Sequence, residues 1–277
     1  MLSAIIIAYN EAANIADCLA SLDGVCDDIV IADSGSTDGT REIAEKMGAR
    51  VIVQPFLGDG PQRNLAASHA RNDWIVCLDA DERLSPELRD YLKTHDVTAS
   101  GLQGFTVRRR NYVMGRWVRY NGWYPDRLVR IYDRRELGYT DKFWHAANTG
   151  ERVGQLEQEI IHHSYASVGA LLNPYRHSCI GALMLYRDGR KAGPLTALAR
   201  GSWTFFRSYI LKRGILGGLD GFHVALAAGY GTYQKYAILH ELRSDPERLK
   251  HYTSFWPTFA AEGGAHGDDA KGKEQPR

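Results

Sequence analysis

The chain has 277 residues, of which 44% are hydrophobic and 24% charged, which excludes a disordered, collagen-like or disulfide-framework protein. Its 34 basic and 33 acidic residues nearly cancel. This average conceals a division, because residues 1–100 hold 17 acidic and 8 basic residues, net −9, and residues 101–277 hold 16 and 26, net +10. We infer that the two parts meet different partners.

Strand-like and helix-like segments alternate through the first hundred residues. Short apolar runs predict buried strands, and apolar residues at three- and four-residue spacing predict helices. The predicted strands are 3–8, 29–32, 50–54 and 74–78, and the predicted helices are 14–22, 40–47, 61–69 and 86–95. Four successive strand–helix units of this kind predict an α/β fold, with a mostly parallel sheet flanked by helices on both faces.

After residue 98 the pattern becomes less regular. We expect a strand at 104–107, a basic and aromatic stretch over 108–135, irregular chain to 164, and helices from 168 to 242. The predicted organisation is therefore an α/β domain over 1–167 with halves 1–100 and 101–167, a helical C-terminal extension over 168–261, and a disordered tail over 262–277.

The cysteines and the apolar runs bear on location. Cys18, Cys26, Cys77 and Cys179 have neither zinc-ligand nor disulfide-framework spacing, and isolated thiols are typical of a reducing cytoplasm. The longest nearly apolar stretch, 214–230, is interrupted by an acid and a histidine, so we expect no membrane-spanning helix.

Polar residues follow three of the predicted strands. They are Tyr9-Asn10-Glu11, the run from Asp33 to Gly39, and Asp79-Ala80-Asp81-Glu82. Ligands of parallel sheets bind at the carboxyl ends of the strands, so these residues point to one site. Converging acids are costly unless they meet a cation or hydrogen-bond donors. For Asp33 and Asp38, a role in turns alone is the alternative.

Asp79 and Asp81 carry the sharpest signal. At i and i+2 beyond a buried strand, two carboxylates can share a hard divalent cation that also takes oxygens from a diphosphate. The phosphatase motif that begins with a nucleophilic Asp looks similar. It needs Thr or Val where this chain has Arg83, and it usually follows the first strand rather than the fourth.

Taken together, these segments resemble the motifs of family 2 glycosyltransferases of the GT-A fold, at 5–11, 29–38, 62–64 and 78–82. Two later segments, 123–130 and 162–167, resemble the lipopolysaccharide core β-1,4-glucosyltransferase subgroup. The resemblance implies a GT-A-type catalytic domain, with 1–100 as its nucleotide-sugar-binding half and 101–167 as its acceptor-binding half.

The implied reaction moves a hexose, glucose by preference, from a UDP-sugar to a sugar of a lipid-linked acceptor, in the heptose region of the lipopolysaccharide core, with inversion. The alternatives are the same chemistry on a polyprenyl-linked or protein acceptor, or a non-catalytic sugar-nucleotide or glycan-binding protein of the same fold.

The resemblance also implies roles for single residues on the donor side. The nucleotide contacts fall on Ala8, Tyr9, Glu11, Asp33, Arg63 and Asp79. Asp81 would bind Mg²⁺ or Mn²⁺ that bridges the donor diphosphate. A histidine of the 162–163 pair, by preference His162, would be an extra metal ligand, with a structural hydrogen-bonded histidine as the alternative.

Displacement at the anomeric carbon needs a general base that takes the proton of the acceptor hydroxyl. The candidate is Asp126, a lone carboxylate among arginines, and its alternative role is a simple salt bridge. Many relatives carry Glu after the residue that matches His145, where this chain has Ala146, which leaves Glu151 and Glu157 as other candidates.

Residues 101–140 hold nine arginines, no lysine and three acids. Arginine forks bind phosphates through two hydrogen bonds, so we expect a phosphorylated glycolipid acceptor, contacted by Trp123, Tyr124, Arg127 and Arg130. A solvated basic face is the alternative. No nucleic-acid partner is expected, because no recognised nucleic-acid-binding motif accompanies the stretch.

The stretch 174–215 holds eight basic residues and one acid, interleaved with aromatic residues. Trp203, Phe206 and Ile210 fall on one helix face, a composition typical of helices that lie on an anionic membrane surface. Packing of this face against the catalytic domain is the alternative. We therefore expect a cytoplasmic protein, peripheral on the inner membrane.

Overall fold

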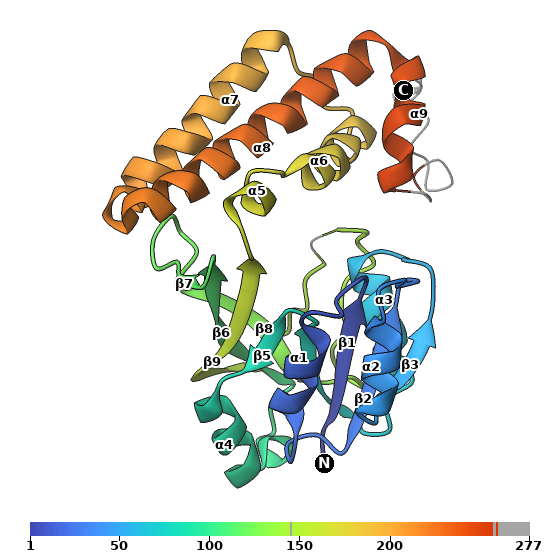
Figure 1. Ribbon diagram of the computed structural model, residues 1–277. Helices are drawn as coiled ribbons and strands as arrows, with labels where there is room; N and C mark the ends of the chain where they lie inside the picture. The colour runs from blue at the N-terminus through green and yellow to red at the C-terminus, as the bar shows by residue number, and fades with distance from the viewer. Residues whose placement is uncertain (145, 257–258, 260–277) are drawn as a thin grey trace, which may run out of the picture. The chain divides into compact units, whose positions relative to one another are not determined.

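The computed structural model describes residues 1–144, 146–256 and 259 (Figure 1). The chain forms two compact units. The α/β unit comprises Met1–Trp117 and Trp123–Ser164, and the helical unit comprises Val118–Gly122 and the described residues from Tyr165 onward. The short segment 118–122, which lies within the α/β region of the sequence, thus belongs with the helices. The tail 262–277 lies outside the described residues.

The α/β unit contains one mixed sheet, which confirms the predicted fold class. Its strands lie in the order β3-β2-β1-β4-β8-β6-β9-β5, with β7 paired to β6. They are β1 (Ser3–Ala8), β2 (Asp28–Asp33), β3 (Arg50–Val53), β4 (Trp74–Asp79), β5 (Glu82–Leu84), β6 (Gly104–Val113), β7 (Arg116–Trp117), β8 (Asp126–Asp133) and β9 (Val153–Tyr165). The first four are parallel, and β8, β6 and β5 pair antiparallel with their partners.

The sheet curls into a half-barrel. β5 follows β4 almost directly in the chain, yet it pairs with β9 at the far end of the strand order. The antiparallel part must therefore bend back toward β4. This curvature brings the end of β9 beside the loop that follows β4, which positions the site described below.

Helices follow the parallel strands, as the pattern predicts: α1 (Ile15–Leu22), α2 (Thr40–Lys46), α3 (Asp59–Ser68) and α4 (Pro86–Thr94). Successive residues of β1 point to opposite faces. Ile6 packs in one buried cluster with Leu78, and Ile5 packs in a second with Cys77. The sheet is therefore covered on both faces, which explains why its central strands are apolar throughout.

The prediction of irregular chain over 136–164 was wrong for its second part, which forms a strand, and the predicted strand 104–107 is only the first part of a longer one. β6 runs on to Val113, and β8 and the long β9 follow it. Charged side chains pair across these strands, since both Arg108 and Arg127 bond to Glu157, at 3.0 and 2.7 Å. Such pairs stabilise a sheet surface without the apolar alternation that identifies a strand in a sequence.

The helical unit contains α5 (Val168–Leu171), α6 (Tyr175–Arg187), α7 (Pro194–Phe206), the π-turn η2 (Arg207–Leu211), the 3₁₀ turn η3 (Gly214–Gly217), α8 (Gly218–Ser244) and α9 (Leu249–Tyr252). Asn121 ties the segment 118–122 to these helices through its side-chain amide, which donates to Ser208 Oγ at 3.0 Å and to the Gly221 carbonyl at 2.9 Å. Among the described residues, no helix combines the length and the apolar character needed to cross a membrane.

Candidate functional site

The predicted site residues of the first half meet at the carboxyl ends of the parallel strands. Ala8 ends β1 and lies beside Asp33, the last residue of β2. Asp79 ends β4 and lies beside Ile7 of β1. The structure therefore brings together the three polar segments that the sequence places after separate strands. We call this edge the strand-end site.

Asp33 and Asp38 shape the loops of the strand-end site. Asp33 is completely buried and accepts hydrogen bonds from the Ser36 amide and hydroxyl of its own turn. The Ser36 hydroxyl in turn accepts from the Asn10 amide at 2.8 Å, and Asp38 accepts from the Ala12 amide at 3.0 Å. The turn after β2 is thereby fastened to the loop after β1, where Tyr9 is exposed and Ala8 buried.

Glu11 lies in the same acidic environment. Burial raises the pKa of its carboxyl group, and the nearby Asp81, Asp38 and Asp79 raise it further, against one hydrogen bond from the Asn14 side chain. The electrostatic field at Glu11 therefore favours a bound cation or hydrogen-bond donor.

Asp79 is held by two buried arginines. Its Oδ1 lies 2.6 Å from Arg63 Nη2 and its Oδ2 lies 2.9 Å from Arg130 Nη2. Burial opposes ionisation of Asp79, but the two guanidinium groups outweigh it and hold its pKa well below the ordinary value. Asp79 is therefore an ionised group whose two oxygens are already bonded.

Glu82 connects Asp79 to the candidate base. Its side chain is completely buried and accepts from Arg130 at 2.8 Å and Arg109 at 3.2 Å. Arg109 in turn lies 2.7 Å from Asp126. The five residues form a continuous series of ion pairs, Asp79–Arg130–Glu82–Arg109–Asp126, which we call the arginine–carboxylate chain. It joins the loop after β4 to the first residue of β8.

Sequence reasoning gave no role to Glu82 or Arg109. Glu82 stands beside the Asp pair and was read as part of that acidic cluster, and Arg109 is one of three consecutive arginines. The signal that identifies them is strand register, because Arg109 is the direct cross-strand partner of Asp126. Register is not readable from one sequence whose strands are charged.

His162 and Asp81 face each other beside this chain. The pairing of β5 with β9 sets Glu82 opposite His162, which brings His162 Nε2 to 3.1 Å from Asp81 Oδ2. Burial lowers the pKa of His162, but the hydrogen bond and charge of Asp81 outweigh it and the pKa is raised. The other ring nitrogen contacts Asn111 Oδ1 at 2.6 Å and the Ser164 hydroxyl at 2.9 Å.

His163 points elsewhere. Its ring stacks on Tyr112, and its Nε2 lies 3.1 Å from an Arg83 nitrogen. Burial and the Arg83 charge lower its pKa. Only the His162 side chain of the pair therefore meets the Asp81 carboxylate, because His163 contacts Asp81 through its backbone amide, which donates to the Asp81 carbonyl at 3.0 Å.

The Asp81–His162 pair fits a divalent cation held jointly with a substrate. In the described part of the chain, no group of three or more His, Cys, Asp or Glu residues is arranged to hold a metal ion. The pair offers one carboxylate oxygen and one imidazole nitrogen, a donor set that suits Mn²⁺ better than Mg²⁺. Asn111 and Ser164 fix the imidazole ring from behind, as second-layer partners of metal ligands do.

Three of the four predicted acceptor residues lie near the surface of the α/β unit, and their polar groups are already engaged. The Tyr124 hydroxyl donates to Glu159 at 2.8 Å. Arg127 donates to Glu157 at 2.7 Å. Trp123 is half-buried, and its carbonyl accepts from the Asn111 side chain at 3.1 Å.

Arg130 does not lie on an acceptor surface. Only 4% of this residue is exposed, and its guanidinium bonds to Asp79 and Glu82 inside the α/β unit. The prediction that Arg130 contacts the acceptor is therefore corrected, because Arg130 lies inside the α/β unit, next to the strand-end site. The other two base candidates are exposed: the Glu157 side chain is 68% exposed, and Glu151 is exposed as well. His145, which precedes Ala146, lies outside the described residues.

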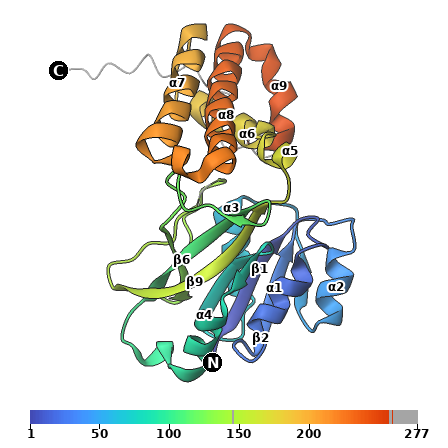
Figure 2. The same cartoon turned by 60° about the vertical axis from the view of Figure 1, so that its left-hand side comes forward.

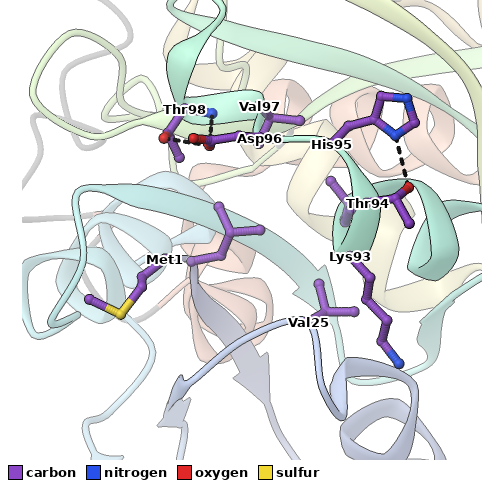
Figure 3. Close-up of a pocket in the computed structure, with 10 residues that line it drawn as sticks. Met1, Val25, Lys93, Thr94, His95, Asp96, Val97 and Thr98 are labelled. Atoms are coloured by element: carbon purple, nitrogen blue, oxygen red, sulfur yellow. Dashed lines mark hydrogen bonds between the residues drawn. The ribbon is translucent and has the colours of Figure 1, made fainter.

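Figure 3 shows a cavity of about 310 Å³ elsewhere in the α/β unit. It is lined by Met1, Leu2, Val25 and residues 92–98, so it lies where β1 begins and α4 ends. Ligands of such sheets bind at the opposite, carboxyl ends of the strands. Asp96 is occupied there by the Thr98 amide and hydroxyl. The cavity is separate from the strand-end site.

Known proteins resemble this chain over its α/β unit and beyond. An uncharacterized glycosyltransferase of Rickettsia felis is 30% identical over 258 residues, covering 87% of this chain and 89% of that protein. The lipopolysaccharide core biosynthesis glycosyltransferase LpsC of Rhizobium meliloti is 37% identical over 119 residues, covering 41% of this chain and 44% of that protein.

Among solved structures, glucosyl-3-phosphoglycerate synthase from Mycobacterium tuberculosis, in complex with Mn²⁺, UDP and glucosyl-3-phosphoglycerate, is 29% identical. It covers 40% of this chain and 44% of that chain, with a TM-score of 0.33. The family model described as glycosyl transferase family 2 matches residues 3–155, more than half of the chain. With the Rickettsia felis relative, which matches most of both chains, this match places the chain in glycosyl transferase family 2, as a glycosyltransferase.

Proposed function

We propose that the chain is a metal-dependent inverting transferase. It moves a hexose, glucose by preference, from a UDP-sugar to a sugar of a lipid-linked acceptor, in the heptose region of the lipopolysaccharide core. The similarity to LpsC, whose name assigns it to lipopolysaccharide core biosynthesis, supports the acceptor class. The arginine–carboxylate chain carries the proposal, because it fixes Asp126 at the same edge as Asp79 and Asp81.

On the donor side, the loop after β1 supplies the nucleoside contacts, through the Ala8 backbone, the exposed Tyr9 ring and Glu11. Asp33 is given a positioning role in this proposal, because its carboxylate is buried and bonded within its own turn. Arg63 also has a positioning role, because its guanidinium holds Asp79 in the ionised form. These residues together present an acidic, preformed edge to a nucleotide.

Asp81 and His162 would hold Mg²⁺ or Mn²⁺ together with the donor diphosphate, and the cation would neutralise the charge of the leaving UDP. The protein alone supplies two ligands, so strong metal binding is expected only with the nucleotide present. Asp79 is left out of this ligand set, because both of its oxygens are bonded to arginines.

Asp126 is the proposed general base. Its side chain is 29% exposed, so an acceptor hydroxyl can reach it, and the 2.7 Å contact with Arg109 holds the carboxylate in place. Asp126 accepts the hydroxyl proton while the acceptor oxygen bonds to the anomeric carbon and the bond from that carbon to the diphosphate oxygen breaks. Attack from the face opposite the leaving UDP inverts the anomeric centre.

The experiment is UDP release from UDP-glucose with Mn²⁺ or Mg²⁺, with and without a heptose-containing core acceptor. Asp81→Ala is expected to abolish release, and Asp126→Asn to abolish transfer with UDP affinity retained. Glu157→Gln is the matched variant, because Glu157 is also an arginine-paired carboxylate at the surface. Tight UDP binding by the wild type without turnover on any donor would contradict the proposal and indicate a binding protein.

A further inference from the structure

The helices α7 and α8 form an antiparallel hairpin that is in close contact through glycines and exposes large apolar side chains. They lie side by side in both views of the molecule (Figures 1 and 2). We call the segment from Pro194 to Ser244 the α7–α8 hairpin. Small residues are buried on both helices, Ala197 and Gly201 on α7 and Ala225 and Gly229 on α8, although α8 also buries Val224, Ile238, Leu239 and Leu242. Large apolar side chains are at the same time left exposed on the hairpin, where an amphipathic helix in water presents polar ones.

Glycines set the close approach of the two helices. A Cβ on Gly201 would lie 2.9 Å from the Tyr233 Cβ and 3.0 Å from the Gly229 carbonyl. A Cβ on Gly229 would lie 2.9 Å from the Phe205 Cβ. Ala197 and Ala225 are buried as well. Contact through small residues is the rule for helix pairs in lipid, where large apolar side chains gain nothing by turning inward.

Large apolar side chains are left on the outside of the hairpin. Leu195, Leu198, Phe206, Leu211, Leu216 and Leu219 are between 44% and 78% exposed. They extend from the first turn of α7 through the turns η2 and η3 to the start of α8. A surface of this kind, with aliphatic residues from adjacent elements, marks an interaction site rather than ordinary surface.

The charge of the same segment indicates what covers this surface. Residues 194–244 hold six basic residues and two acids, Asp220 and Glu241. Lys212 and Arg213 are exposed between Leu211 and Leu216, at the turn of the hairpin. Basic residues beside exposed apolar ones complement the phosphates and the acyl chains of an anionic lipid layer.

The length of α7 and the limited apolar character of the longer α8 set the depth, since no described helix is both long and apolar enough to cross a membrane. α7 has 13 residues, about 20 Å at 1.5 Å per residue, against about 30 Å of hydrocarbon core. We propose that the outer face of the α7–α8 hairpin docks on an anionic lipid bilayer, with Leu211, Leu216 and Leu219 inserted into the interfacial layer and Lys212 and Arg213 among the headgroup phosphates. This inference goes beyond the proposed sugar transfer and does not depend on it.

The test is sedimentation of the full chain with vesicles of phosphatidylcholine alone or with about 30% phosphatidylglycerol, at low and high salt. The wild type sediments with the anionic vesicles, and salt weakens the binding. Each basic residue near the surface raises the vesicle partition coefficient about 5-fold, so the double variant Lys212→Gln/Arg213→Gln lowers it about 30-fold. The triple variant Leu211→Ser/Leu216→Ser/Leu219→Ser lowers it more than about 100-fold.

The matched control compares single substitutions. Met47 is 43% exposed on the α/β unit, so Met47→Ser leaves vesicle binding unchanged while Leu216→Ser weakens it. UDP affinity and circular dichroism stay at wild-type values in every variant, which separates loss of docking from loss of folding. They also separate docking from the transferase proposal, because vesicle binding is measured without a donor or an acceptor.

Three results overturn the proposal. One is a wild type that stays in the supernatant with anionic vesicles. Another is a triple variant that sediments as the wild type does. The third is a lipid-free wild type that is dimeric in sedimentation velocity while the triple variant is monomeric, because the face then belongs to an interface between two copies of the chain.

Discussion

Arg109 on β6 and Asp126 on β8 are direct cross-strand partners, and Nη2 of Arg109 lies 2.7 Å from Oδ2 of Asp126. Arg109 also lies 3.2 Å from the buried Glu82, whose other oxygen accepts the amide hydrogen of Asp79 at 2.9 Å. The proposed base is therefore held from the side of the donor site. The pairing of β6 with β8, rather than a flexible loop, therefore sets the position of Asp126 relative to the strand-end site.

Arg109→Gln tests that link. The substitution leaves Asp126 without its partner, so we expect kcat to fall about 100-fold with UDP affinity nearly unchanged. Steady-state kinetics and UDP titration separate the two effects. Arg127→Gln is the control, because it removes one of the two arginine partners of the exposed Glu157 and should leave kcat within a few-fold. Equal losses in the two variants would argue against a special role for the Arg109–Asp126 pair.

Arg130→Gln tests the buried part of the chain. It removes the shared partner of Asp79 and Glu82 and leaves the buried Glu82 and the partly buried Asp79 with less charge compensation. Breaking such a pair typically lowers the free energy of unfolding by about 3–5 kcal/mol, and urea denaturation would measure this loss. Arg152→Gln removes an exposed pair with Glu136 and should cost less than about 1 kcal/mol. A similar small loss for Arg130→Gln would contradict the structure.

His162→Ala tests the metal assignment. If His162 completes the cation site, this substitution weakens Mn²⁺-dependent UDP binding by at least about 10-fold, while UDP binding without metal changes little. Isothermal titration with and without Mn²⁺ measures both. His163→Ala serves as the control because His163 stacks on Tyr112 away from Asp81. A metal effect in His163→Ala and none in His162→Ala would reverse the assignment.

The acid limb of the stability curve tests Asp28. Burial raises the pKa of this carboxyl group, but hydrogen bonds from the Arg71 amide, the Arg50 guanidinium and the Ser3 hydroxyl outweigh it and the pKa is lowered. A lowered pKa stabilises the fold at pH values above the pKa of the unfolded chain, about 3.9. This stabilisation is lost as the pH falls through the lower pKa of the folded chain. Asp28→Asn is therefore less stable than the wild type at pH 7.

The difference in the free energy of unfolding between the wild type and Asp28→Asn should become smaller from pH 5 to pH 3. Urea denaturation midpoints at each pH measure this difference. The neighbouring Asp27→Asn is the matched control, because Asp27 accepts one exposed bond from the Asn72 side chain. A gap for Asp28→Asn that stays constant down to pH 3 would contradict the account.

The sequence predicts the parallel half of the fold because each of its signals is local. Apolar strands such as β1 and β4, and the Ser85 cap of α4, identify themselves within a few residues. The strand ends then gather Asp33 and Asp79 without further information, because parallel strands share one carboxyl edge.

The antiparallel half could not be predicted in the same way. Its strands are stabilised by pairs between distant charged residues, such as Arg127 with Glu157, and these pairs hide the two-residue alternation. Whether Arg130 meets an acceptor or Asp79 depends on which face of β8 turns inward, and a shift of one residue reverses that face. For the same reason the sequence suggested Asp126 as a base without suggesting Arg109 as its partner.

The most direct test of the central claim is transfer of the hexose from UDP-glucose to a heptose-containing core acceptor, with product followed by mass spectrometry and UDP release measured in parallel. The account predicts metal-dependent transfer by the wild type. It also predicts loss of about a thousand-fold or more in Asp126→Asn, with UDP affinity intact. An Asp126→Asn enzyme that transfers at the wild-type rate would contradict it.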